Sequence, residues 1–125
     1  MYLFGFKSEK RLNDLEPKMA DVCRLALRYS RVDFSIVETL RTLEQQQLNV
    51  VNGDSWTLNS KHLANKKGLS EAVDIYPWVN GQTSHSKEHY NQVAKAMFRA
   101  AIELGVQIKW GGFWGQMDCP HWEIG

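Results

Sequence analysis

Four histidines and a few acidic side chains are the residues of this 125-residue chain that suit metal or acid–base chemistry. His62 lies in a long polar segment, and His121 begins the last apolar segment. Asp74 stands inside the apolar run Ala72–Tyr76, where a carboxylate is costly unless it is paired or bound to a metal. Two imidazoles, one carboxylate and an open position for water form a common catalytic zinc site. The alternative for Asp74 is a buried carboxylate that is hydrogen-bonded to backbone or to an arginine.

Asp118 lies three residues before His121 and is the candidate for proton transfer. A carboxylate beside a metal ligand can take a proton from an attacking water and pass it to a leaving amine. The alternative is an ordinary turn aspartate in the segment Met-Asp-Cys-Pro. Cys119, beside Pro120, is expected to point away from the metal.

Two further features have competing interpretations. His85 and His89, four apart on a predicted helix, suit one metal, but their polar and charged neighbours favour a solvated helix face. Three tryptophans gather near the C-terminus, where stacking on sugars or a peptide and packing in the core are equally good explanations. They are Trp110, Trp114 and Trp122.

Hydrophobic periodicity predicts the elements that position these residues. The expected helices begin with Ser8 as N-cap and with Pro17, and two more cover Leu43–Val51 and Ser86–Leu104. The expected strands are Val32–Glu38, Ala72–Tyr76 closed by Pro77, Val106–Trp110 and His121–Ile124, with tight turns at Asn80-Gly81 and Gly111-Gly112. Helices and strands that do not alternate strictly favour an α+β fold, a small mainly antiparallel sheet packed with helices. We expect one domain over residues 1–125.

Composition restricts the class of protein. Apolar residues make up 43% and charged residues 23%, as in ordinary globular proteins, and a net charge of +1 gives no reason to expect a nucleic-acid partner. Cys23 and Cys119 are expected to be free thiols. The N-terminus lacks the pattern of a secretory signal, and no run is long enough for a membrane span. We therefore expect a monomer that is made in the cytoplasm.

Several motifs, in order along the chain, resemble one family. Asn59–Leu63 and Glu71–Asp74 resemble the Ser-x-His and Ala-x-Asp motifs of the D-alanyl-D-alanine and L-alanyl-D-glutamate zinc peptidases. The segment Asp118–Glu123 is similar to the closing Asp-x-x-His motif of that family. Phage-type members also resemble this chain in their opening, in a strand and arginine turn, and in a late Trp-Gly-Gly. The corresponding segments here are Phe4–Leu12, Phe34–Glu44 and Trp110–Gly112.

The resemblance implies a function and residue roles. His62, Asp74 and His121 would bind Zn²⁺, and Asp118 would be the general base and then the acid. Arg41 would bind a substrate carbonyl or carboxylate, and Ser60 would support the substrate or the oxyanion. The activity implied is that of a phage endolysin that cuts between L-alanine and D-glutamate in bacterial peptidoglycan after release to the periplasm. The alternatives are a D-alanyl-D-alanine carboxypeptidase and a catalytically silent, zinc-containing module that binds the wall.

One departure from the family lies between the first two expected ligands. Eleven residues, 63–73, separate His62 from Asp74, more than is usual in the family, and the extra ones fall around Ala64–Gly68. Ser70 stands where the family has glycine. We expect this insertion to be a mobile loop on the substrate side, with Lys66 and Lys67 facing an anionic stem peptide.

Overall fold

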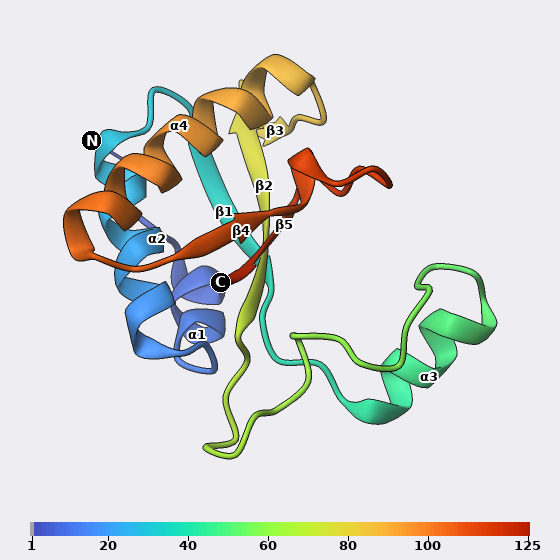
Figure 1. The fold of residues 1–125 in the computed structure, drawn as a ribbon. Coiled ribbons are helices and arrows are strands. Elements are labelled where there is room, and N and C mark those ends of the chain that lie inside the picture. The colour runs from blue at the N-terminus through green and yellow to red at the C-terminus, as the bar shows by residue number, and fades with distance from the viewer. Residues whose placement is uncertain (1) are drawn as a thin grey trace.

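The computed structural model describes residues 2–125 and shows helices gathered around a small sheet (Figure 1). The helical elements are α1 (Phe6–Leu12), α2 (Pro17–Tyr29), α3 (Leu43–Val51), α4 (Lys87–Leu104) and the short 3₁₀ helix η1 (Gly111–Phe113). The strands are β1 (Asp33–Glu38), β2 (Ala72–Val79), β3 (Gln82–Thr83), β4 (Ile108–Trp110) and β5 (His121–Ile124).

The sheet is antiparallel, with strand order β1-β2-β5-β4, and β3 pairs with β2 at its far end. Helices α2 and α4 pack on each other, and α1 packs against β1. In Figure 1 these three helices gather on one side of the sheet, while α3 stands away from them. The predicted α+β fold with a small antiparallel sheet is confirmed.

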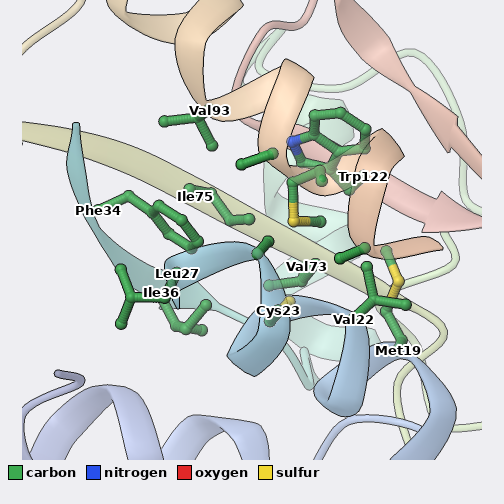
Figure 2. Close-up of a cluster of buried hydrophobic side chains, with 14 of the residues drawn as sticks. Met19, Val22, Cys23, Leu27, Phe34, Ile36, Val73, Ile75, Val93 and Trp122 are labelled. Carbon is green, nitrogen blue, oxygen red and sulfur yellow. The ribbon is translucent and has the colours of Figure 1, made fainter. Parts of the chain in front are cut away.

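The hydrophobic core lies between this sheet and the helices (Figure 2). Val73 and Ile75 of β2 are 0% and 1% exposed, and they join the same core as Ile36 of β1 and Trp122 of β5. Such burial contributes roughly 25 cal/mol per Å² of apolar surface. Because side chains alternate along a strand, Asp74 must point to the opposite face of the sheet. The strand that anchors the core therefore also presents a polar side chain away from it.

Three expected boundaries are wrong by two residues or more, and the simplest case is β4, which begins at Ile108 rather than Val106. Helix α1 begins at Phe6 rather than after Ser8, whose Oγ instead accepts a hydrogen bond from the Ile36 backbone N–H at 3.1 Å. Strand β2 continues through Pro77 to Val79, because Pro77 lies beyond the stretch Ala72–Asp74 that pairs with β5. A proline N, which has no proton, is tolerated here because the side away from β1 pairs through the Pro77 O, which accepts from the Ser84 N–H at 2.9 Å.

The predicted Asn80-Gly81 turn is present and closes a short hairpin between β2 and β3. Asn80 and Gly81 have φ angles of 54° and 79°, as a two-residue hairpin turn requires. No helix within residues 2–125 has both the length and the apolar character needed to cross a bilayer.

Candidate active site

Strand pairing places three ionisable residues in one row across the sheet. Asp74 of β2 has Glu38 of β1 as one Cα partner and His121 of β5 as the other. A bulge between Ile36 and Glu38 shifts the register, so Glu38 rather than Val37 stands opposite Asp74. The polar face of the sheet thus gathers two carboxylates and an imidazole.

His62 reaches the same place from the segment between α3 and β2. Its backbone O accepts a hydrogen bond from the Arg41 N–H at 2.9 Å, and its own N–H donates to the Ser60 Oγ at 3.1 Å. The ring Nδ1 lies 2.7 Å from the Thr39 carbonyl oxygen. His62 is 1% exposed, so the orientation of its ring is set by these contacts rather than by solvent.

His62, Asp74 and His121 form the one group of potential metal donors found among residues 2–125, with atoms all within 4.8 Å of one another. The Asp74 Oδ1 lies 3.2 Å from the His62 Nε2 and 3.4 Å from the His121 Nδ1. The other nitrogen of His121, Nε2, lies 2.8 Å from the Glu123 Oε1. Each imidazole therefore directs one nitrogen to the centre while a separate acceptor holds the other. This donor set fits zinc, which favours histidine nitrogens oriented in this way.

The electrostatics of the cluster favour an ionised aspartate. Burial alone would raise the pKa of Asp74, but hydrogen bonding to His121 and His62 and their charge hold that pKa well below its usual range. Burial acts to lower the pKa of His121, yet hydrogen bonding to Asp74 and Glu123 outweighs it and raises the pKa. Without a cation the two residues stabilise each other, and a divalent cation would take over the neutralisation of Asp74.

Asp118 lies in the segment that leads from η1 back to β5. Its backbone N–H donates to the Gly111 O at 2.9 Å, and its carbonyl accepts from the His121 N–H at 3.1 Å. A Cβ on Gly111 would lie 2.2 Å from the Asp118 O, so only glycine permits this approach. Burial, and next the charge of Asp74, raise the pKa of the Asp118 carboxyl, which brings it nearer the range useful for proton transfer.

The Arg41 side chain is hydrogen-bonded to two elements. Its Nε and Nη2 donate to the Glu38 Oε1, the Nε at 3.1 Å, and its Nη1 donates to the Gln46 Oε1 at 2.5 Å. The side chain is 12% exposed. This ties the guanidinium to β1 on one side and to α3 on the other.

A cleft of about 430 Å³ joins these residues. It lies within the usual range for small-ligand sites. All of the residues predicted from the sequence to bind metal, act on protons or contact substrate line it: Arg41, Ser60, His62, Asp74, Asp118 and His121. Trp114 also lines the cleft, with its ring 5.1 Å from that of His121.

The competing candidates lie elsewhere. The Nδ1 of His85 is 2.8 Å from the Tyr90 hydroxyl and that of His89 is 2.6 Å from the Ser84 Oγ, and neither histidine lines the cleft as described for residues 2–125. Trp110 and Trp122 stack at 5.4 Å within the core. Of the three clustered tryptophans, Trp114 alone lies at the site. Cys119 is outside the donor group found in the described chain.

Several residues at the site were not predicted from the sequence, among them Glu38, Gln46, Trp56 and Glu123. Glu123 is two residues after His121 in the closing motif, so its place beside that ring could most readily have been predicted from the sequence. Glu38 depends on the strand bulge, and Gln46 is the buried residue of an otherwise exposed helix α3. Neither feature has a pattern in the sequence.

The insertion after His62 lies away from the cleft, contrary to expectation. The Asn65 Nδ2 donates to the Glu16 Oε1 at 2.6 Å, and the Lys67 Nζ lies 3.3 Å from the Glu16 Oε2. Residues 63–70, all of which the structure describes, are outside the cleft lining. The prediction of a substrate-side loop is therefore wrong, because a buried carboxylate at the start of α2 binds this segment instead.

The sheet residues Asp74 and His121, with His62 from the preceding loop and the half-buried Asp118 in the same cleft, define the class of candidate metal-dependent hydrolases. Comparison with known proteins narrows this class. A family model described as phage L-alanyl-D-glutamate peptidase matches residues 1–124. This chain therefore belongs to the phage L-alanyl-D-glutamate peptidase family.

Individual relatives agree with that assignment. An L-alanyl-D-glutamate peptidase of Escherichia phage T5 is 35% identical, over 98% of this chain and 89% of the relative. An L-alanyl-D-glutamate peptidase of Listeria phage A118 is 32% identical, over 92% of this chain and 40% of the relative. Among solved structures, the L-Ala D-Glu endopeptidase ChiX of Serratia marcescens matches with a TM-score of 0.88 and 38% identity, covering 98% of this chain and 90% of that chain.

Proposed function

We propose that this chain is a zinc-dependent endopeptidase of phage lysis that cleaves the L-alanyl-D-glutamate bond of the peptidoglycan stem peptide. The observation that carries the proposal is the buried His62–Asp74–His121 group in an open cleft that also holds Asp118. Family membership identifies the bond, and the cleft supplies the groups that its hydrolysis needs.

The metal would be held by the His62 Nε2, an Asp74 carboxylate oxygen and the His121 Nδ1. When bound there, zinc supplies a Lewis acid that polarises the scissile carbonyl and lowers the pKa of water. The Thr39 carbonyl and the Glu123 carboxylate keep both imidazoles turned toward the centre. Such outer contacts fix the ring orientation and raise the basicity of the ligands.

Asp118 would remove the proton from the attacking water and return it to the leaving amine of D-glutamate. Burial raises the pKa of this carboxyl, and a pKa nearer the working pH favours general acid–base catalysis. Arg41 would bind a carbonyl or carboxylate of the substrate, with its planar guanidinium held in place by Glu38 and Gln46. The Ser60 oxygen accepts from the His62 N–H, which leaves its hydroxyl proton for the substrate.

We further propose that residues 1–125 act as one catalytic domain and as a monomer, on the cell wall after release from the host cytoplasm to the periplasm. A core shared by α1, α2, α4 and the sheet supports a single unit.

Digestion of purified peptidoglycan tests the function. Mass spectrometry should show new free amino groups on D-glutamate and L-alanine with a free carboxyl group left on the lactyl groups of the glycan, and His121→Ala should produce neither. Release of terminal D-alanine alone would identify a carboxypeptidase. Sedimentation with the wall and no new termini would identify a binding module.

A further inference from the structure

Trp56 lines the cleft and is nevertheless 61% exposed. Single exposed apolar residues are common on protein surfaces, so exposure alone carries no meaning. The informative feature is its place: it forms part of the wall that the segment after α3 contributes to the cleft. Trp114, by contrast, is half-buried and packs against His121 at the metal cluster itself.

Part-buried hydrogen bonds hold the residues on both sides of Trp56. The Gln46 Nε2 donates to the Ser55 Oγ at 2.9 Å and to the Thr57 carbonyl at 2.6 Å. Gln46 is 0% exposed, and its Oε1 accepts from Arg41. One buried amide therefore connects the position of Trp56 to that of the cleft arginine. Because its two neighbours are held before a ligand arrives, less conformational entropy of this segment is lost on binding.

The polar side chains around Trp56 complement an aromatic ring in a specific manner. Asn49, Asp54 and Asn59 line the same cleft as Trp56 and offer amide and carboxylate groups. A flat apolar ring beside such donors and acceptors matches a sugar, which has an apolar C–H face and a rim of hydroxyl and acetamido groups.

The chemistry of the substrate requires a sugar close to the cut bond, a step that rests on the proposed function. In peptidoglycan the stem L-alanine is joined directly to the lactyl group of N-acetylmuramic acid. One residue spans at most about 3.6 Å. The sugar therefore lies only one residue and one lactyl group from the L-alanyl-D-glutamate bond, so it is close to the cleft whenever that bond lies at the His62–Asp74–His121 cluster.

We propose that Trp56 is the sugar-binding residue of this enzyme, on whose ring the N-acetylmuramic acid of the substrate stacks. Gln46 is the positioning residue that presents it. The enzyme then distinguishes stem peptides that are attached to glycan from peptides that are free.

Two soluble substrates with the same scissile bond test this. One is the disaccharide N-acetylglucosaminyl-N-acetylmuramyl-tripeptide, and the other carries only a D-lactyl group on the same tripeptide, so the two differ by the sugars alone. Wild-type enzyme should have the higher kcat/KM on the disaccharide substrate, mainly through a lower KM. Trp56→Ala should reduce that preference roughly tenfold, the equivalent of one stacked contact. Trp56→Tyr should retain most of it.

Trp78→Ala is the matched control, because Trp78 is 40% exposed on β2 and lies outside the cleft lining given for residues 2–125. It should keep the wild-type preference. Equal wild-type rates on the two substrates, or a Trp56→Ala enzyme with the preference intact, would overturn the sugar subsite. A wild-type protein that cuts neither substrate would instead overturn the proposed function.

Discussion

The two nitrogens of each clustered imidazole have different tasks. In His62 the Nδ1 faces the Thr39 carbonyl and the Nε2 faces Asp74, whereas in His121 the Nε2 faces Glu123 and the Nδ1 faces Asp74. The two rings therefore use opposite nitrogens toward the centre. This follows from their origins, since His62 enters from a loop beside β1 and His121 is part of a strand that pairs with β2.

Removing one of the imidazole nitrogens that face Asp74 should greatly weaken zinc binding. His121→Ala should lose most of the zinc that the wild-type protein retains after dialysis, because two protein ligands hold zinc far less well than three. The measurement is metal content by mass spectrometry of the purified protein. A variant with His85 and His89 both changed to alanine is the control and should keep its zinc. Equal zinc in wild type and His121→Ala would rule out this ligand set.

Asp118→Asn should separate proton transfer from metal binding. The amide keeps the size of the side chain and the backbone contacts to Gly111 and His121, but it cannot accept a proton. We expect kcat to fall about 10²–10⁴-fold with zinc content and thermal midpoint close to wild type. Turnover on purified peptidoglycan, measured with metal analysis on the same sample, checks this. A variant that loses its zinc would show Asp118 to be a ligand instead.

Much of the site could be predicted at the scale of single residues. A lone carboxylate between Val73 and Ile75 indicated a functional group. The order of the family motifs then predicted that His62 and His121 lie beside it. The residues that orient the site were harder to find. Gln46 stands between two other glutamines in α3, so its residue type and neighbours do not indicate burial. Its burial depends on Arg41 and the Ser55–Thr57 segment, which only the folded chain brings together.

At the scale of elements, the η1–β5 segment depends on close backbone contact. Gly111→Ala would place a Cβ 2.2 Å from the Asp118 O, so this segment must shift. We expect a loss of about 1–3 kcal/mol in stability and a reduced kcat, because Asp118 moves with it. Gly115→Ala, in the same segment with nothing within 4 Å of the added Cβ, should be near neutral. Urea denaturation and turnover of both variants test the prediction, and equal behaviour would contradict it.

The insertion after His62 stabilises the start of α2 through hydrogen bonds to Glu16. Asn65 donates to Glu16, which is 7% exposed, and its Oδ1 accepts from the Lys67 and Leu69 backbone N–H groups. Asn65→Ala should cost about 1–3 kcal/mol because a buried carboxylate loses a partner. Activity should stay near wild type, since the segment is away from the cleft.

Urea denaturation and kcat/KM on one preparation measure both effects. Lys66→Ala, at an exposed neighbouring position, should change stability by less than about 0.5 kcal/mol. If Asn65→Ala instead leaves stability unchanged and alters KM, the loop serves the substrate after all. The position of this loop was not predictable, because its lysines suit an anionic substrate and a buried Glu16 equally well.

Across the whole molecule, core and site share the sheet. The helices cover one face through Ile36, Val73, Ile75 and Trp122, and the other face carries Glu38, Asp74 and His121 in one row. The two-residue alternation of a strand makes this division predictable for β2. The order of the strands was not predictable, because β5, the last element, pairs between β2 and β4. That placement requires contacts between distant parts of the chain.

The shared core should also make the protein sensitive to alkali through Cys23. Burial raises the pKa of this thiol to about 12, with the Arg24 charge acting slightly in the other direction. An unfolded cysteine ionises near pH 8.5, roughly. Between these values the unfolded chain binds fewer protons than the folded one, so stability is fully present below the unfolded pKa and is lost as pH rises.

In this range Cys23 lowers the free energy of unfolding by an amount that approaches about 1.4 kcal/mol per pH unit. Urea denaturation of wild type and Cys23→Ala from pH 8 to about 10.5, at equal zinc, should therefore show a steeper decline for wild type. Tyr90, whose pKa burial raises to about 12, adds the same decline to both proteins and cancels in the difference. Cys119 is likewise present in both. Parallel stability curves would show that the Cys23 thiol ionises in the folded protein as easily as in the unfolded chain, and hence that water reaches the core between α2 and the sheet.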